Sequence, residues 1–365
     1  MSLYEELSPL VPVCERIKSS NLPVILYGMG NGADRISDYL SENSVLISGV
    51  AASEGFLRGQ SFKGFKVESI KELEKRFGKL CLVLCFGLEG EKAKILKPLE
   101  KRHFLVSPNM PVVGEGVCDK KHILDRIYDF SFVYDRLSDG LSKKIYLSVL
   151  KYDITGDISY LDTGMGSETA PDGYYDRDGI HLDVGAYDGD TVIEFIKNRK
   201  KETNIIAFEP DRKTYEKLLK NTENMPFVKA ENMMVSDRTG EAFFDWKKGR
   251  ASRAFEKGAS GNENSEKIKK VSIDDYCGYK YISSKGLPVG SMKIDAEGED
   301  EKVICGAANT LYCSKSNINV SLYHRAFDLV DIPLLLMRYG YGYEFYIRKK
   351  EYVPAWDVML YALKR

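Results

Sequence analysis

The stretch that most constrains the fold of this chain is Asp-Val-Gly-Ala-Tyr-Asp-Gly-Asp at residues 183–190. A mainly apolar run at 180–182 precedes it and is typical of a short buried strand. Gly185 and Gly189 permit a tight turn and a close approach of the backbone to a ligand. Residues 191–196 then have the pattern of a helix, whose first N–H groups favour an anionic ligand group. Strand, turn and helix in this order predict a cradle for a nucleoside cofactor.

A second acidic position supports this interpretation. Glu209 ends the apolar run 205–208 and lies twenty positions after Gly189. A carboxylate at the end of the next strand can accept hydrogen bonds from both hydroxyls of a ribose. The alternative is that Glu209 only caps a helix that starts after Pro210.

Composition excludes several classes of protein. With 365 residues and 43% apolar residues, the chain is long enough for about two domains. Lys and Arg number 53 against 54 acids, so no charge surplus predicts a nucleic acid or an anionic membrane as partner. The N-terminal residues lack the pattern of a signal peptide, and no apolar run is long enough to span a bilayer. We therefore expect a cytoplasmic protein, with no nucleic-acid and no membrane partner.

The alternation of strand and helix patterns predicts an α/β protein with two doubly wound domains. We expect a small Rossmann-like domain at 1–116, a helical connector and loop at 117–178, and a second α/β domain at 179–365. Two strand patterns at 343–348 and 358–362 predict an antiparallel hairpin at the edge of the second sheet. The polar run 258–270 has the composition of a loop.

The first domain has a glycine-rich turn of its own, Gly-Met-Gly-Asn-Gly-Ala at 28–33. It fits the dinucleotide pattern, but the following strand ends in Val-Ala-Ala-Ser at 50–53, without the ribose acid. Glu54 is the nearest acid and falls in a glycine-containing loop. An NAD-dependent oxidoreductase is thus one alternative, and the missing acid counts against it.

Four ordered blocks between about 180 and 363 resemble the FkbM family of S-adenosylmethionine-dependent methyltransferases. These blocks are Leu-Asp-Val-Gly-Ala-Tyr-Asp-Gly-Asp-Thr at 182–191, Phe-Glu-Pro-Asp at 208–211, Met-Lys-Ile-Asp-Ala-Glu-Gly-Glu at 292–299, and Tyr-His-Arg at 323–325. The resemblance implies a class I methyltransferase sheet and O-methylation, often of a hydroxyl on a sugar or another glycan or natural-product acceptor. More weakly, the first domain looks like the small Rossmann-like domain at the head of sugar-modifying enzymes, which implies a nucleotide-sugar or dimer-building role.

With that cofactor in mind, the binding residues follow from position at the carboxyl ends of the strands. We expect the methionine part beside Asp183, Gly185, Ala186, Tyr187, Asp188, Gly189, Asp190 and Thr191. Asp183 or Asp188 would lie near its ammonium group. Glu209 and Pro210 would border the ribose, and Met234 and Val235, expected to end the third strand, would border the adenine.

Three further residues are candidates for catalysis. Asp295 and Glu297 follow the fourth strand, where the acceptor should meet the methyl group. Two such carboxylates can hold a divalent metal, orient a hydroxyl, act as a base, or merely cap the next helix. His324 follows the fifth strand and is the natural base for a hydroxyl, or else it has a structural hydrogen-bonding role. Arg325, Arg253 and Arg348 could bind an anionic group of the acceptor, or lie solvated at the surface.

The expected partner is a small-molecule or glycan acceptor, such as a nucleotide-sugar. A non-catalytic cofactor-binding module is a second alternative, since a fold does not establish activity. The acceptor, the methylated atom, metal dependence and any homo-oligomer are left open by the sequence.

Overall fold

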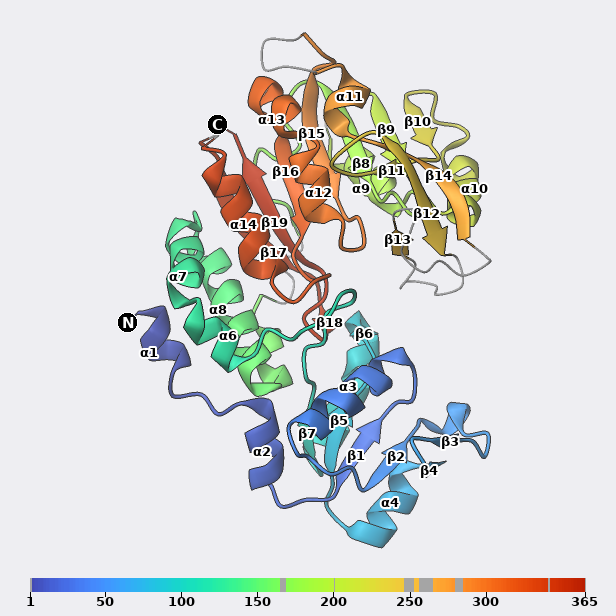
Figure 1. The fold of residues 1–365 in the computed structure, drawn as a ribbon, viewed down its shortest axis with the longest axis vertical. Coiled ribbons are helices and arrows are strands. Elements are labelled where there is room, and N and C mark those ends of the chain that lie inside the picture. The colour runs from blue at the N-terminus through green and yellow to red at the C-terminus, as the bar shows by residue number, and fades with distance from the viewer. Residues whose placement is uncertain are drawn as a thin grey trace.

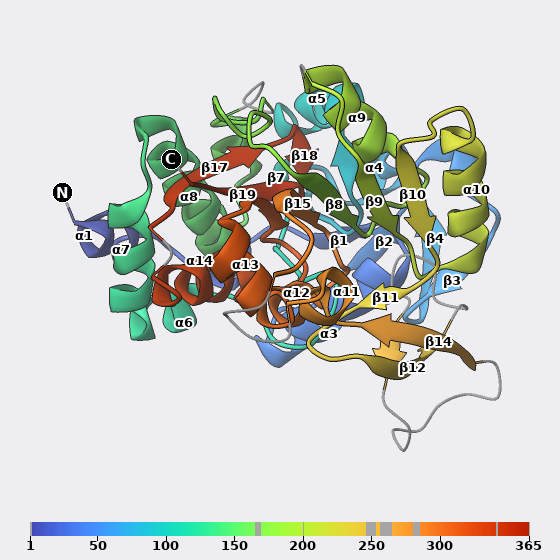
Figure 2. The same ribbon diagram turned by 90° about the horizontal axis from the view of Figure 1, so that it is seen from above.

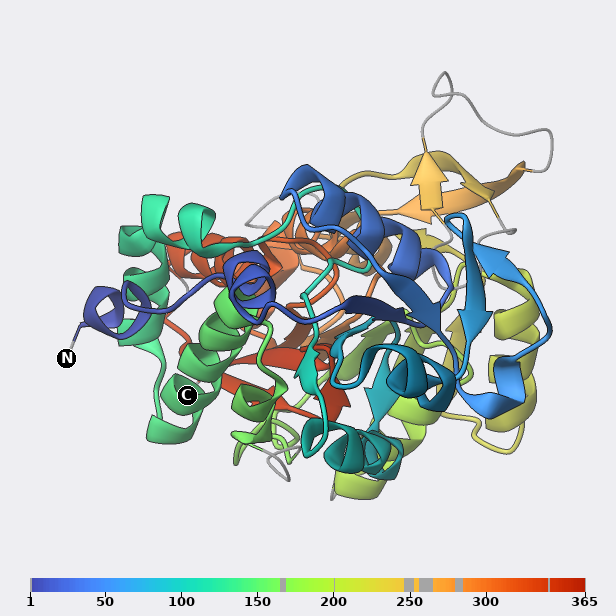
Figure 3. The same ribbon diagram turned by 90° about the horizontal axis from the view of Figure 1, so that it is seen from below.

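The computed structural model describes residues 2–164, 169–199, 201–245, 253–255, 265–279, 285–340 and 342–364. Over these residues the chain forms two mainly parallel sheets flanked by helices, one in each half of the sequence (Figure 1). A group of connector helices lies beside both halves (Figure 3). The predicted α/β class with doubly wound sheets is confirmed.

The first sheet has six strands in the order β3-β4-β2-β1-β5-β7, and only the pair β3–β4 is antiparallel. Its strands are β1 Val24–Tyr27, β2 Gly49–Ala51, β3 Ser61–Phe62, β4 Phe65–Glu68, β5 Cys81–Leu84 and β7 Phe104–Val106. The helices of this part are α1 Leu3–Leu7, α2 Val13–Ser19, α3 Asn31–Glu42, α4 Ile70–Phe77 and α5 Lys97–Glu100, with 3₁₀ turns η1 Glu54–Phe56 and η2 Gly90–Leu96. Helix α3 begins at the first glycine turn, and Glu54 is held by Lys71 at 2.8 Å.

The second sheet has seven strands in the order β10-β9-β8-β15-β16-β19-β17. Its strands are β8 Ile180–Val184, β9 Ile205–Phe208, β10 Val228–Glu231, β15 Val289–Ile294, β16 Asn317–Ser321, β17 Glu344–Lys349 and β19 Val358–Leu363. Strand β19 runs antiparallel to both its neighbours, which confirms the predicted closing hairpin. The helices that follow these strands are α9 Asp190–Asn198, α10 Arg212–Thr222, α12 Asp300–Cys305, α13 Ala308–Ser314 and α14 Asp328–Arg338.

The two faces of this second sheet differ in chemistry because side chains alternate along each strand. On one face, apolar residues such as Leu182, Met292 and Val320 are fully buried in the main core with residues of α12, α13 and α14. The opposite face carries polar residues, among them Asp183 and Lys293. Such a half-polar face in the middle of a parallel sheet is unusual, since parallel sheets are normally covered by apolar contacts on both sides.

The connector consists of three helices, α6 Lys120–Asp125, α7 Ile127–Arg136 and α8 Gly140–Thr155, followed by η3 Ile158–Asp162. Asp139 caps α8 by accepting from the N–H of Ser142 at 2.6 Å, and the same carboxylate holds Arg348 of β17 at 2.8 Å. One capping residue thus starts the helix and docks it on the edge of the second sheet.

A separate four-stranded sheet projects at one side of the second sheet (Figure 2). It is formed by β11 Met234–Val235, β12 Gly240–Asp245, β13 Arg253–Phe255 and β14 Ser265–Val271, with helix α11 Ile273–Cys277 after it. The prediction of a loop at 258–270 is wrong for its last part, because Ile268 is buried against Met234 and residues 265–270 pair with β12. Residues 258–264 lie outside the described part of the chain.

The two halves of the chain are joined by a small two-stranded sheet. Strand β6, Leu88–Glu89, comes from the first half and pairs antiparallel with β18, Tyr352–Val353, in the loop between β17 and β19 (Figure 1). Gly87, just before β6, lies so close to Trp356 and Tyr352 that an added Cβ would come within 2.8 Å of each. No helix in the described ranges has the length and apolar character that crossing a membrane requires.

The glycine turn after β8 should be sensitive to any added side chain. Gly185 has a φ of +74°, and a Cβ at this position would lie 1.9 Å from the backbone carbonyl oxygen of Asp295. We expect Gly185→Ala to lower the free energy of unfolding by about 2 kcal/mol or more, from both the strained φ and the overlap. Urea denaturation of the wild type and the variant measures this difference in the free energy of unfolding. The matched control is Gly55→Ala, where nothing lies within 4 Å; equal stability of both variants would contradict the close packing.

Candidate active site

The turn between β8 and α9 has an irregular backbone. Gly185, Tyr187 and Gly189 have φ values of 74°, 49° and 94°, and Gly189 is the N-cap of α9. The N–H groups of Gly185 and Ala186 both donate to the carbonyl of Phe208 at 3.0 Å. A non-glycine residue with positive φ is strained and is common at ligand sites. The turn predicted from the sequence is therefore present, and its backbone is fixed by hydrogen bonds to the last residue of strand β9.

Asp183 lies beneath this turn and is fully buried. Its Oδ2 accepts a hydrogen bond from the hydroxyl of Thr191 at 2.6 Å, and its Oδ1 faces Nζ of Lys293 at 3.3 Å. Asp188, by contrast, is only partly buried. Of the two residues considered for the cofactor ammonium, Asp183 is therefore engaged inside the protein and Asp188 is partly open to solvent.

Lys293 is the residue that links the two halves of the site. It is buried in β15 and donates to the carbonyl oxygen of Gly185 at 2.7 Å, and it lies 3.8 Å from Oδ2 of Asp295. Burial alone would lower the pKa of Lys293, but the charges of Asp183 and Asp295 outweigh it and raise the pKa. In the sequence this lysine is only part of the motif at 292–299, and no role was predicted for it. A lysine inside an otherwise apolar strand was the available signal, since a buried charge must be paired.

Glu209 lies where the sequence predicted, directly after β9, and is buried. Its Oε2 accepts from the N–H of Tyr187 at 3.0 Å and its Oε1 from the N–H of Asp211 at 2.8 Å. Each carboxylate oxygen keeps a lone pair for a further donor. Burial raises the pKa of Glu209 to about 7, against the two backbone N–H groups, which lower it. Asp211, not Glu209, caps α10, by accepting from the N–H of Thr214.

Met234 and Val235 are not where the sequence placed them. The third strand is β10, which ends at Glu231, whereas Met234 and Val235 form β11 and pair with β14 of the separate sheet. Both side chains are buried. The residue that does follow the third strand is Asn232, whose Nδ2 donates to the carbonyls of Glu209 and Pro210 at 2.9 and 3.0 Å. Sequence reasoning extended the third strand too far and missed Asn232.

The structure brings Asp295, Glu297 and His324 together, as their positions after β15 and β16 predicted. Nε2 of His324 lies 3.2 Å from Oδ1 of Asp295 and 3.8 Å from Oε2 of Glu297. Its Nδ1 lies 2.9 Å from Oδ2 of Asp300, at the start of α12. Asp300 was missed by sequence reasoning. Its signal was an acid two residues after Gly298, at a helix start.

These contacts set the charge of His324. Burial would lower the pKa of the imidazole, but the carboxylates of Asp300 and Asp295 together hold it well above its ordinary value. Burial would raise the pKa of Asp295, but Lys293 and His324 lower it strongly. The cluster is therefore an ionised network at neutral pH, and His324 becomes a free base only at a pH above the ordinary range for histidine.

A segment from the first half of the chain supports this cluster from behind. The N–H of Val113 donates to the carbonyl of His324 at 2.9 Å, and a Cβ on Gly298 would lie 2.3 Å from the Val113 side chain. Arg35 of α3 holds the same segment through the carbonyls of Pro111 and Gly114, the latter at 2.9 Å. The loops that follow β15 and β16 are thus packed against residues about 200 positions earlier in the sequence.

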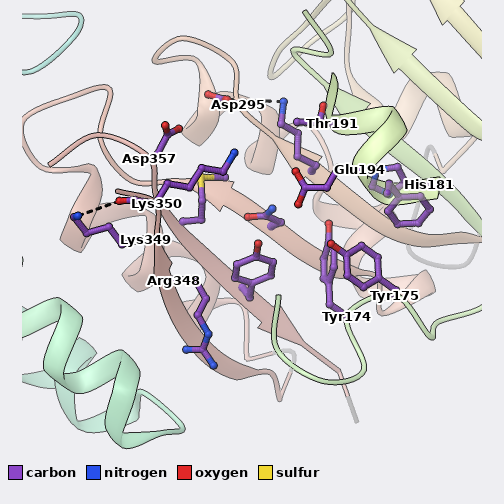
Figure 4. Close-up of a pocket in the computed structure, with 15 residues that line it drawn as sticks. Tyr174, Tyr175, His181, Thr191, Glu194, Asp295, Arg348, Lys349, Lys350 and Asp357 are labelled. Atoms are coloured by element: carbon purple, nitrogen blue, oxygen red, sulfur yellow. Dashed lines mark hydrogen bonds and ion pairs between the residues drawn. The ribbon is translucent and has the colours of Figure 1, made fainter. Parts of the chain in front are cut away.

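A cavity opens on the polar face of the second sheet, beside Asp295 (Figure 4). Its lining combines Thr191 of α9, Lys293 of β15, and further side chains from several elements: Tyr174, Tyr175, His181, Glu194, Phe195, Asn319, Arg348, Lys349, Lys350, Asp357, Met359 and Tyr361. The hydroxyl of Tyr174 and Oδ1 of Asn319 are buried there without a hydrogen-bond partner within the described residues.

Two of the three arginines considered for binding an anionic acceptor, Arg348 and Arg325, already form hydrogen bonds within the protein. In Figure 4 the Arg348 side chain points away from Asp295. It donates to Asp139 at 2.8 Å and to the hydroxyl of Ser142 at 3.1 Å. Arg325 donates through Nε to the carbonyl of Gly298 at 2.6 Å. The side chain of Arg253 lies outside the described part of the chain.

Known protein families and solved structures were compared with this chain, and both comparisons find similar methyltransferases. Residues 183–344 match the model of the methyltransferase FkbM domain. This range begins at Asp183 and includes Glu209, Asp295 and His324. No curated protein sequence matches the chain at a significant level.

Among solved structures, methyltransferase FkbM from Methylobacillus flagellatus KT is similar over 99% of this chain and 98% of its own, with 16% identity and a TM-score of 0.66. The fold is therefore shared over both sheets. Aeropyrum pernix fibrillarin with natively bound S-adenosyl-L-methionine (9% identity, TM-score 0.31, 51% and 67% covered) and Haemonchus contortus phosphoethanolamine N-methyltransferase 2 (8%, 0.27, 95% and 84%) are too distant to inform this site. Residues 183–344 of this chain form an FkbM methyltransferase domain.

Proposed function

We propose that this chain is an S-adenosylmethionine-dependent O-methyltransferase that acts on a sugar hydroxyl of a small-molecule or glycan acceptor, such as a nucleotide-sugar. The observation that carries the proposal is the cavity that joins Thr191, in the first turn of α9 directly after the glycine turn, to Asp295. Donor and acceptor bound on these two sides would meet at the carboxyl ends of β8 and β15, where ligands bind in open α/β sheets.

The cofactor side of the proposal rests on the turn and on Glu209. The family match supports S-adenosylmethionine as the cofactor, and the open lone pairs of Glu209 suit the two ribose hydroxyls. Asn232 borders the carbonyls of Glu209 and Pro210 and is our candidate for the adenine side.

The acceptor side of the proposal rests on the chemistry of the cavity lining. Buried polar atoms without partners are costly, so Tyr174 and Asn319 favour a ligand that offers hydroxyl groups. The rings of Tyr174, Tyr175 and Tyr361 provide flat apolar surface beside these polar groups. A sugar presents both kinds of surface.

Methyl transfer to oxygen needs an aligned acceptor and removal of its proton. Asp295 is held by Lys293, by His324 and by the hydroxyl of Tyr323 at 3.3 Å, which fixes its direction toward the cavity. We propose that Asp295 orients the acceptor hydroxyl, and that His324 with Asp295 receives its proton.

Cofactor binding should depend on pH through Glu209. The ribose hydroxyls donate to the carboxylate, so binding favours its ionised form; because the pKa of Glu209 is raised to about 7, affinity for S-adenosylmethionine should increase as pH rises through about 7 and then level off. Glu209→Gln should remove this pH dependence and weaken binding by about 1 to 3 kcal/mol. Titration calorimetry checks both effects. Glu216→Gln, an exposed acid on α10, is the control; an unchanged profile in Glu209→Gln would contradict the ribose assignment.

Turnover should report the ionisation of His324. Only the neutral imidazole accepts a proton, and the neighbouring carboxylates raise its pKa, so activity should rise with pH above the ordinary histidine range. His324→Asn should reduce kcat about 10² to 10⁴-fold with cofactor affinity retained. If His324→Asn keeps near wild-type turnover and the same pH profile, His324 is not the base, and Asp295 or Glu297 receives the proton instead.

The reaction itself is tested by incubating the protein with labelled S-adenosylmethionine and a panel of nucleotide-sugars. We expect S-adenosylhomocysteine together with transfer of the labelled methyl group to a sugar oxygen. Cofactor binding without S-adenosylhomocysteine across acceptors of every class would favour the non-catalytic module. Methyl transfer to nitrogen or carbon would overturn the assignment to oxygen.

A further inference from the structure

The acidic cluster around His324 has the arrangement of a metal site. We propose that Nε2 of His324 and the carboxylates of Asp295 and Glu297 bind one divalent transition-metal cation, with Asp300 as the residue that orients the histidine. This inference rests on the proposed function and changes one part of it: with a cation on Nε2 in place of its proton, His324 is a ligand and no longer the base. The binding of the cation can be measured without any acceptor.

The orienting role of Asp300 follows from its hydrogen bonds. Its Oδ1 accepts from the N–H of Ala296 and the hydroxyl of Ser321, both at 2.8 Å. Its Oδ2 accepts from the N–H of Gly298 at 3.0 Å and lies 2.9 Å from Nδ1 of His324. Four donors occupy the four lone-pair positions of this buried carboxylate, so none is left for a cation.

Because Nδ1 donates to Asp300, the remaining nitrogen of His324 is Nε2. It is buried and faces the carboxylates of Asp295 and Glu297, but its contacts with the described residues lack hydrogen-bond geometry. A histidine whose other nitrogen donates to a carboxylate is the usual arrangement of a metal-ligating imidazole, because that bond fixes the tautomer and the ring direction.

The distances agree with a shared ion. Two ligand atoms that each lie about 2.1 Å from one ion, at angles between octahedral and tetrahedral, are separated by about 3.0 to 3.4 Å. Nε2 lies 3.2 Å from Oδ1 of Asp295, inside this range, and 3.8 Å from Oε2 of Glu297. Glu297 is half exposed, so a small side-chain movement closes the last distance.

Charge and access also favour a cation here. Three carboxylates surround one imidazole, and Lys293 approaches only the opposite oxygen of Asp295, Oδ2, at 3.8 Å. Asp295 lines the cavity, so coordination positions not used by the protein face the proposed acceptor. One imidazole with two carboxylates suits Mn²⁺, Fe²⁺ or Zn²⁺ better than Mg²⁺ or Ca²⁺, which prefer oxygen ligands alone. Bound there, the cation would acidify an acceptor hydroxyl, whose proton would then leave to solvent through the cavity instead of to His324.

The test uses the full-length protein, stripped with a chelator and dialysed, and titrated with Mn²⁺ while electron paramagnetic resonance follows the free ion. We expect one Mn²⁺ per chain. His324→Gln and Glu297→Gln should each weaken binding at least about tenfold, and Asp300→Asn about 10 to 100-fold, through lost orientation. Glu301→Gln, which removes the same charge from an exposed position on α12, should bind like the wild type.

Absence of a Mn²⁺ site, or a site that survives in both His324→Gln and Glu297→Gln, would overturn the proposal and leave His324 as an ion-paired imidazolium. Circular dichroism of each variant separates lost ligands from lost folding, and the exposed position of Glu297 makes Glu297→Gln informative even if His324→Gln unfolds. Calorimetry with S-adenosylmethionine on the same samples keeps the two proposals apart. Mn²⁺ binding without cofactor binding would contradict only the proposed function.

Discussion

The buried ammonium group of Lys293 is the interaction on which the rest of the site depends. It bridges the carbonyl of Gly185, the carboxylate of Asp183 and the carboxylate of Asp295, and so joins the glycine turn after β8 to the end of β15. A buried cation without partners is very costly, so these three groups hold one another in place. The positions of the two proposed substrates are therefore set by a single charge network inside the sheet.

This network explains why the second sheet has a polar face. A parallel sheet covered on both sides would leave no room for a ligand. Here the residues that alternate with the core, such as Asp183, Lys293 and Asn319, open onto a cavity next to the glycine turn. The apolar face, packed against α12 to α14, supplies the hydrophobic stabilisation, while the opposite face carries the polar and ionisable side chains that line the cavity.

The first half of the chain also contributes to the site, although no residue of its glycine turn does so directly. Arg35 holds the segment that donates from Val113 to the carbonyl of His324. Strand β6 pairs with β18 in the loop that carries Asp357 of the cavity. These contacts give the first sheet a supporting role that is independent of any nucleotide bound to it.

The sequence by itself determined the α/β class, the glycine turn, the position of Glu209 directly after β9, and the meeting of Asp295, Glu297 and His324, because each depends on local patterns and on the rule that parallel strands share a carboxyl edge. It misplaced Met234 and Val235, since strand ends are weakly marked in short apolar runs. Only the tertiary structure decided that Lys293 contacts Asp183 and Asp295, and that Asp300 contacts His324 and raises its pKa. Their roles come from partners that are distant in sequence and from burial, and neither is written in a local pattern.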